Sequence, residues 1–357
     1  MRLLLGAVLL GAPVAAGAAA PSVPVRVGTV VREDLPISIG GLGTVQAWRS
    51  VTARAQVNGY LTELDFHEGQ EVHRGDLLAV VDPRPYAALL AQAEAKKAGD
   101  AATLANYQVN YRRDSTLAHD QYASRQQADN DMALVRQFQA NVLGDEAAVM
   151  QAKLNLAFCR ITAPIDGVVG FRLIDVGNLI QNAAQTAIVT IQQVHPIAVV
   201  FTLAEQDLPR VQEARARGTL PAAAYSSDEE TLLGRGTLVT PNNTIDSTTG
   251  TISLKAVFAN RQDLLWPGQY VNVRLQLRVQ KNAVVVPLEA VQHGPDGLYV
   301  YVVRPDHTVH NRSIEVGYQD ARVAMVTAGL QGGESIVLDG QSRLQDGTRI
   351  AAEPAHA

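Results

Sequence analysis

Residues 87–163 contain no proline, although the chain has 16 prolines in all. Apolar residues recur within this run at helical spacing but sparsely, a pattern typical of helices that are exposed to water. Asp82 and Pro83 indicate a helix start, as N-cap and first helical residue, and Ser124 with Gln127 forms a capping box that starts a second helix. The run therefore predicts a two-helix hairpin whose arms, of roughly 33–35 residues, are each about 50 Å long.

The segment between the two arms reads YRRDSTLAHDQYASRQ over residues 111–126. Breaks between helices usually carry Gly or Pro, but this one carries charged and hydroxyl side chains instead. A connector needs only to turn, so these side chains suggest that the turn also binds something. With the turn centred near Gln121, the register pairs Leu104 with Phe138 and Tyr107 with Val135, and it brings Lys97 near Asp145 and Glu146.

Two segments that flank the hairpin repeat each other. AQVNGYLTELDFHEGQEV spans residues 55–72, and APIDGVVGFRLIDVGNLI spans residues 163–180. Both alternate apolar and polar positions and end in turn residues, as short β-strands do. We predict that they are the two halves of one small β-sandwich, paired about a pseudo-two-fold axis. The aligned glycines, which we expect in turns that need a positive φ, are Gly59 with Gly167 and Gly69 with Gly177.

Strand-like alternation continues on both sides of this repeat. It covers residues 23–32 and 36–45 before the hairpin, and residues 188–277 and 282–350 after it. A short helix is expected within the later part, at residues 205–217. Segments before the hairpin are thus expected to pair with segments after it, which predicts domains nested within one another.

Composition narrows the class of protein. The formal net charge is −5 and no basic stripe stands out, which argues against a nucleic-acid-binding protein. The one cysteine, Cys159, cannot form a disulfide within the chain, and we expect it to be a small buried residue.

The first residues, MRLLLGAVLLGAPVAAGAAAPS, have the pattern of a secretory signal peptide. Arg2 precedes an apolar stretch, and the small residues at 16–18 form a cleavage site. The alternative is a retained membrane anchor, but Gly11 and Pro13 interrupt the run, which barely reaches the roughly 20 residues that a span needs. No cysteine lies near the cleavage site, so a lipid on an N-terminal cysteine is not expected.

Three long stretches resemble a known family, and together they extend the resemblance over essentially the whole mature chain. They are VTARAQVNGYLTELDFHEGQEVHRGDLLAVVDPRPY (51–86), RITAPIDGVVGFRLIDVGNLI (160–180) and TGTISLKAVFANRQDLLWPGQYVNVRL (249–275). The pattern resembles the periplasmic adaptor, or membrane fusion, proteins of tripartite efflux pumps. Within the HlyD-type superfamily it is similar to the AcrA/MdtA type, which serves RND transporters.

The resemblance implies an elongated, multidomain α+β fold in which a long antiparallel α-helical hairpin is inserted in a split lipoyl-like β-sandwich. A β-barrel domain and a β-rich membrane-proximal domain complete it. The expected boundaries are a signal peptide at 1–18, a membrane-proximal domain at 23–33 and 280–352, a β-barrel at 34–47 and 184–279, a lipoyl-like domain at 48–82 and 158–183, and the α-helical hairpin at 83–157.

The same resemblance implies a role for the hairpin tip. In the family, an Arg, a Leu four residues on and a Ser seven further dock on an outer-membrane channel, and here these positions are Arg113, Leu117 and Ser124. Arg offers a planar fork for carbonyls or carboxylates, Leu an apolar contact and Ser a hydrogen bond. Each residue also has a simpler reading: Ser124 as an N-cap, Leu117 as part of the helix seam, and Arg113 as a solvated helix residue.

Other classes of function lack the residues they need. A lipoyl or biotinyl carrier presents a modified lysine between its two halves, where this chain has the helical insert, and residues 1–94 contain no lysine. No phosphate loop, nucleophile elbow or His-Glu-x-x-His motif is present, so we expect no enzyme activity and no cofactor. His67 and His73 lack a third ligand and the four methionines do not cluster, so no metal site is expected.

We therefore expect a periplasmic adaptor that links an inner-membrane RND transporter to an outer-membrane channel in drug efflux. The resemblance implies six copies in the pump and association with the inner membrane through the transporter. The alternative is an adaptor for an ABC-type exporter, a class that often keeps an N-terminal transmembrane helix.

The N-terminal pattern makes a direct prediction. The mature protein should begin near Ala19 and carry no lipid, because the small residues at 16–18 precede that position. N-terminal sequencing of protein from the periplasm tests this. Protein that starts at Met1 and stays firmly bound to membranes would contradict it.

Overall fold

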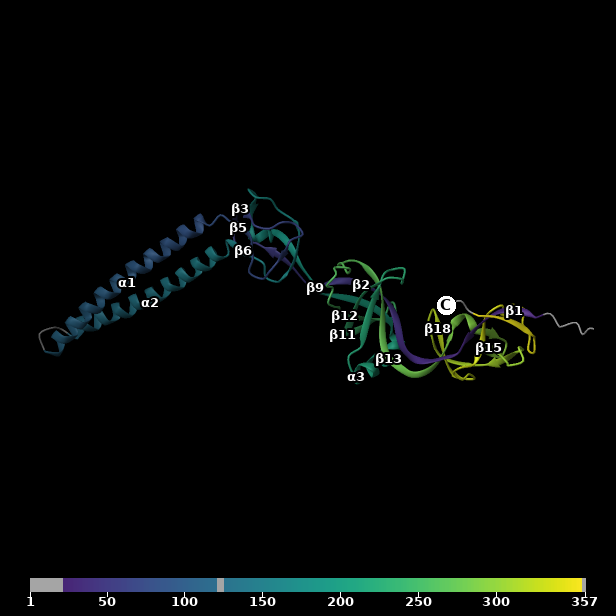
Figure 1. Ribbon diagram of the computed structural model, residues 1–357. Helices are drawn as coiled ribbons and strands as arrows, with labels where there is room; N and C mark the ends of the chain where they lie inside the picture. The colour runs from purple at the N-terminus through teal and green to yellow at the C-terminus, as the bar shows by residue number, and fades with distance from the viewer. Residues whose placement is uncertain (1–21, 121–124, 355–357) are drawn as a thin grey trace, which may run out of the picture. The chain divides into compact units, whose positions relative to one another are not determined.

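The computed structural model describes residues 22–120 and 125–354 (Figure 1). The predicted signal peptide and Ser124 lie outside these residues. With 28% of the chain in helices and 48% in strands, the α+β class is confirmed. The chain divides into two compact units. One comprises Gly40–Leu208 and Pro221–Arg274; the other comprises Pro209–Leu220 with the described residues up to Ile39 and from Leu275 onward.

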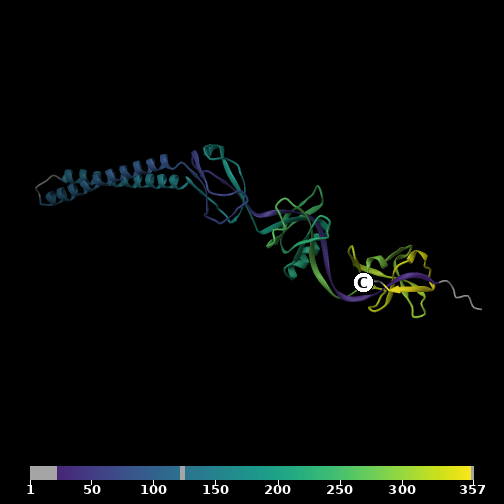
Figure 2. The ribbon, with the colours of Figure 1, turned by 45° about the horizontal axis from the view of Figure 1, so that its top comes forward.

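The predicted hairpin is present in the first unit. Helices α1 (Arg84–His119) and α2 (Arg125–Ala157) lie side by side in both ribbon views (Figures 1 and 2). The prediction of Asp82 as N-cap was wrong by one residue, because Pro83 occupies that position in the αR conformation. The Asp82 carboxylate still accepts the backbone N–H of Arg84 at 3.1 Å, and it also binds the Arg84 guanidinium.

The two repeated segments form one small sandwich by pairing with each other. Gly59 pairs with Ile180 and Val72 with Gly167, so the start of each segment meets the end of the other. The backbone hydrogen bonds obey the same exchange: Leu61 N–H donates to Asn178 O, and Val169 N–H donates to Gln70 O, both at 2.9 Å. The predicted pseudo-two-fold pairing is therefore confirmed. The strands are β3 (Gly59–Leu64), β4 (Glu71–Val72), β5 (Leu77–Val81), β6 (Arg160–Thr162), β7 (Gly167–Arg172) and β8 (Leu179–Ile180).

The four aligned glycines all have positive φ and fall into two equivalent pairs. Gly69 and Gly177, with φ of 79° and 91°, lie in open turns where the backbone conformation alone favours glycine. Gly59 and Gly167 begin strands and are approached closely by neighbours. A Cβ atom on Gly59 would lie 2.7 Å from Val81 Cγ1, and one on Gly167 would lie 2.5 Å from the carbonyl oxygen of Gln192.

The sandwich holds the ends of both helices. Strand β5 leads into α1 and strand β6 follows α2, and the two strands pair with Val80 opposite Arg160. The Val81 N–H donates to the carbonyl oxygen of Cys159 at 2.8 Å. Cys159 is fully buried in the sandwich core, as predicted, and this burial raises the pKa of its thiol. The two helices are therefore anchored side by side where they leave the sandwich.

The remaining part of the first unit is an antiparallel sheet. Strand β9 (Ala187–Ala204) pairs on one side with β2 (Val31–Arg54) and on the other with β12 (Thr251–Phe258). The sheet continues through β11 (Leu232–Asp246) to β10 (Pro221–Tyr225). Alternate residues of β12 are buried, including Leu254 and Phe258. The short helix expected at 205–217 is confirmed as a 3-10 turn (Glu205–Asp207) followed by α3 (Leu208–Arg217), which from Pro209 onward belongs to the second unit.

In the second unit, a strand from the beginning of the described chain pairs with strands from its end. Strand β1 (Val23–Thr29) lies between β19 (Ser335–Asp339) and β20 (Ile350–Pro354), which confirms that segments before the hairpin pair with segments after it. Strand β13 (Tyr270–Pro287) contributes residues to both units and pairs within this one with β18. The other strands are β14 (Gln292–Gly294), β15 (Gly297–Val303), β16 (Val309–Ser313), β17 (Glu315–Gln319) and β18 (Val323–Ala328).

The close approach at Gly167 gives a prediction about stability. Gly167→Ala should destabilise the sandwich by about 1–3 kcal/mol, because the new Cβ would force β7 away from β9. Gly170→Ala, in the same strand, is the matched control: its Cβ would meet Thr190 O at 3.4 Å, an ordinary contact. Hydrogen exchange of the β7 and β9 amides measures both effects. Equal exchange in the two variants would contradict this account.

Candidate partner-binding site at the hairpin turn

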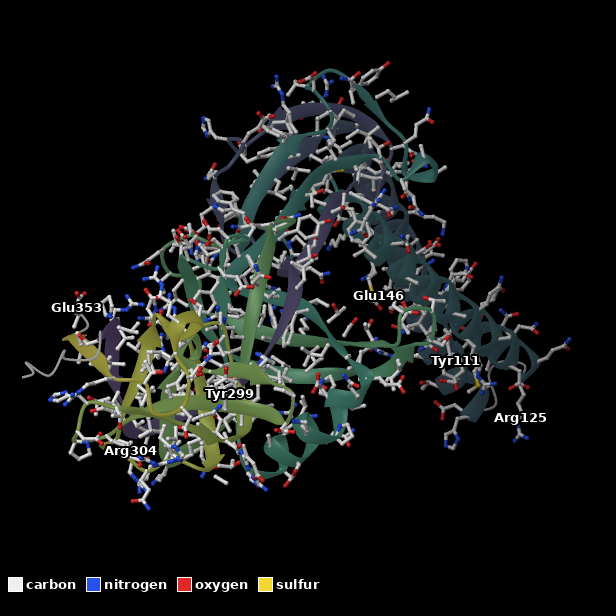
Figure 3. All side chains as sticks on the ribbon, turned by 90° about the vertical axis from the view of Figure 1, so that its right-hand side faces the viewer. Tyr111, Arg125, Glu146, Tyr299, Arg304 and Glu353 are labelled. Atoms are coloured by element: carbon white, nitrogen blue, oxygen red, sulfur yellow. The ribbon has the colours of Figure 1, made fainter. Side chains whose placement is uncertain are left out.

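The turn end of the hairpin lies far along α1 from the sandwich. At 1.5 Å per residue, the 36 residues of α1 extend about 54 Å. Arg125 lies at this end, Tyr111 lies a short way back from it, and Glu146 lies further back along α2 (Figure 3). No residue of α1 is fully buried, so its side chains are available to water or to a partner over the whole length.

Two of the three predicted tip residues lie on one exposed face of α1. Arg113 and Leu117 are four residues apart, which places them one turn above each other on a helix. Both are exposed, and Leu117 exposes 40% of its surface although it is apolar. Leu117 therefore does not close the helix seam. Ser124 lies outside the described residues, so its position relative to this pair stays a prediction.

Contacts between α1 and α2 fix the register of the two helices along the hairpin. Lys97 binds Glu146 at 2.9 Å, as the predicted register requires, and this hydrogen bond lowers the pKa of Glu146. Lys153 binds Glu94 at 3.4 Å nearer the sandwich. Toward the turn, the rings of Tyr107 and Phe138 stack with centroids 5.1 Å apart. The register had placed Val135 opposite Tyr107, so here the facing residue lies about one turn further along α2.

The sequence did not indicate that two acidic residues of α2 would be buried in the seam. Asp131 and Asp145 each expose only 6% of their surface, and each has one carboxylate oxygen without a hydrogen-bond partner among the described residues. Lys96, rather than the predicted Lys97, binds Asp145, and it also binds Asp100 at 3.0 Å. These hydrogen bonds raise the pKa of Lys96, the one with Asp145 having the larger effect.

The described residues at the turn end offer binding chemistry. An exposed Arg and an exposed Leu on one face provide a charged and an apolar contact to a protein surface. Within residues 22–120 and 125–354, no three His, Cys, Asp or Glu side chains come together in a way that could hold a metal ion. In the same residues, no helix is long and apolar enough to cross a membrane.

A hairpin inserted into a sandwich of exchanged halves, followed by further β domains, defines the class of membrane fusion proteins. Three family models match consecutive segments: the RND membrane fusion protein barrel-sandwich hybrid domain at residues 49–192, the beta-barrel domain at 196–279, and the C-terminal permuted SH3 domain at 282–343. The chain belongs to the RND membrane fusion protein family.

Relatives of known name match over most of their length. Multidrug resistance protein MdtA of Erwinia amylovora is 43% identical over 334 residues, which cover 94% of this chain and 82% of that protein. MdtA of Proteus mirabilis is also 43% identical, over 92% of this chain and 80% of its own length.

Solved structures share the fold. MacA from Actinobacillus actinomycetemcomitans gives a TM-score of 0.58 at 22% identity, covering 87% of this chain and 99% of that one. A MacA-MexA chimera that carries the Pseudomonas aeruginosa MexA alpha-hairpin domain gives 0.57 at 25% identity, covering 87% and 100%.

The contrast between two neighbouring lysines gives a second prediction. Lys96→Met should raise hydrogen-exchange rates in the middle of the hairpin by roughly tenfold, because it leaves the buried carboxylate of Asp145 without its cation. Lys97→Met removes only the bond to the exposed Glu146 and should change these rates far less. Equal hydrogen-exchange rates in the two variants would show that burial of the Asp145 carboxylate does not require its ion pair with Lys96.

Proposed function

We propose that this chain is the periplasmic adaptor of a tripartite multidrug efflux pump. It links an inner-membrane RND transporter to an outer-membrane channel and carries out no chemistry itself. The observation that carries the proposal is the 43% identity to MdtA, a multidrug resistance protein, over 82% of that protein's length. The ABC-exporter alternative is not favoured, because the family models that match are those of RND membrane fusion proteins.

The hairpin turn is the part that meets the outer-membrane channel in this proposal. The exposed pair Arg113 and Leu117 supports it, because an apolar side chain held in water next to a cation suits a protein interface. Ser124 would add a hydrogen bond. The β-barrel and membrane-proximal domains would contact the transporter, which supplies the energy and selects the substrates.

The proposal also covers the export of the protein, its association with the membrane and its assembly. The protein is exported to the periplasm by its signal peptide and is not lipidated. It associates with the inner membrane through the transporter. Six copies assemble in the pump, with their sandwiches and hairpins side by side, so any change at the turn is repeated in every copy of the ring. The four-module division of the chain, with the boundaries predicted from the sequence, is part of the same proposal.

Charge reversal at the turn tests the proposal. Arg113→Asp should lower drug resistance to the level of cells that lack the adaptor, because it replaces an attractive contact with a repulsive one. Leu117→Asp should act alike, since it would bury an unpaired carboxylate against the channel. Ser124→Ala should have a smaller effect, combined with fraying of α2 by about 1 kcal/mol. Drug susceptibility of cells that express each variant as their only adaptor is the measurement.

Arg112→Asp is the matched control, because Arg112 is also an exposed arginine and immediately precedes Arg113 on α1, so that it projects about 100° away around the helix. The three aspartate variants should melt like the wild type, with changes in stability within about 0.5 kcal/mol, as for other exposed positions. Full resistance in Arg113→Asp cells, at normal protein levels, would show that the turn is only a connector.

A further inference from the structure

A second buried acid lies close to the turn, and its surroundings differ from those of Asp145. Asp131 on α2 exposes 6% of its surface, and its Oδ2 atom has no hydrogen-bond partner among the described residues. A buried carboxylate without a partner is costly, so such a group is normally paired or neutral. Asp145, at the same degree of burial, is bound by Lys96. Among the residues that the structure describes, no cation is bound to Asp131.

The charged side chain that faces Asp131 is another acid. The stacked rings of Tyr107 and Phe138 set which residues of the two helices face each other. Seven residues, or about two turns, nearer the turn on each helix lie Asp114 of α1 and Asp131 of α2, so these two acids face each other across the seam. From its own helix, Gln127 donates its amide N–H to Asp131 Oδ1 at 3.3 Å. Of the nearby arginines, Arg112 and Arg113 are exposed, and Arg136 donates to the sulfur of Met132. Two carboxylates that face each other in a buried seam repel each other when both are ionised.

We propose that Asp114 and Asp131 form a proton-binding site that ties α1 and α2 together near the turn. One proton, taken from water, is held between the two carboxyl groups, so that one acid donates to the other carboxylate. The proton supplies the partner that Asp131 Oδ2 otherwise lacks. The site lies beside Arg113 and one turn before Leu117, so it controls how firmly the part of α1 that carries them is held against α2.

The direction of the pH effect follows from burial and from the facing acid. Burial raises the pKa of Asp131, the nearby Asp114 raises it further, and the hydrogen bond from Gln127 opposes them. The closed hairpin end therefore binds the proton more tightly than an opened one, in which the pKa of Asp131 returns toward the usual value of about 3.9. The stabilisation is complete in acid and is lost as the pH rises through the raised pKa of Asp131. Acid thus tightens this end of the hairpin.

Hydrogen exchange on the purified full-length protein between pH 5 and pH 8 tests the site without any channel or transporter. The quantity compared is the protection factor of amides in residues 110–119 and 125–135, which removes the direct effect of pH on exchange. In the wild type, protection should fall with rising pH, by up to about tenfold per pH unit for one released proton. Amides around Lys96 and Asp145 should not follow this trend, because that pair holds a cation.

Two variants locate the effect. Asp131→Asn should keep the turn end protected at pH 8 and abolish the pH dependence, since the amide donates a hydrogen bond to Asp114 without needing a proton. Asp114→Asn, at the partly exposed partner, should do the same by donating to Asp131. Asp145→Asn is the control and should leave the pH dependence at the turn unchanged.

Protection at the turn that is independent of pH in the wild type would overturn the proposal. So would the same pH dependence in wild type and in both Asn variants. The effect on docking rests on the proposed function, but the exchange measurement does not. A protein that shows the pH effect yet confers no drug resistance would therefore keep the proton site and lose the adaptor role.

Discussion

The reciprocal pairing of the two sandwich halves is the constraint on which the hairpin depends. Gly59 meets Ile180 and Gly167 meets Val72, and this exchange brings β5 and β6 together at the point where the helices begin and end. Two helices with a seam as dilute as that of α1 and α2 have little apolar area of their own to bury, and isolated helices are marginal in water. The sandwich therefore holds one end of α1 beside one end of α2, which lowers the entropic cost of pairing the two helices.

Beyond the sandwich, polar contacts as well as apolar ones hold α1 and α2 together. Lys97 with Glu146 and Lys96 with Asp145 bridge the helices in the middle, and the Tyr107–Phe138 stack follows. The proposed Asp114–Asp131 site lies two turns beyond this stack, toward the hairpin turn. A long hairpin exposed to water on nearly every side cannot rely on an apolar core, so polar pairs that fit only one register specify how the helices align. The same design leaves the turn end free to bind a partner, because few of its side chains are used in packing.

Much of this architecture could be predicted from the sequence because it depends on local rules. The proline-free run, the aligned glycines and the alternation in the flanking segments each reflect a backbone requirement that single residues reveal. The errors are shifts of one residue, at the start of α1 and across the seam. The sequence predicts Asp82 as the N-cap although Pro83 holds that position, and it places Lys97 near Asp145 although Lys96 binds that acid. Adjacent residues on a helix differ by about 100° in direction, so a shift of one residue changes the partner. The burial of Asp131 could not be predicted, since periodicity assigns acids to the solvent face.

The proposed function depends on contact between the hairpin turn and an outer-membrane channel in cells. Photo-crosslinking from single positions on α1 tests it most directly. A photoreactive residue in place of Leu117, at the turn, is compared with one in place of Leu89, which is exposed by 53% near the sandwich end of the same helix. We expect a crosslinked product that contains the channel protein from position 117 and none from position 89. Absence of that product at position 117, or equal yields at the two positions, would contradict it.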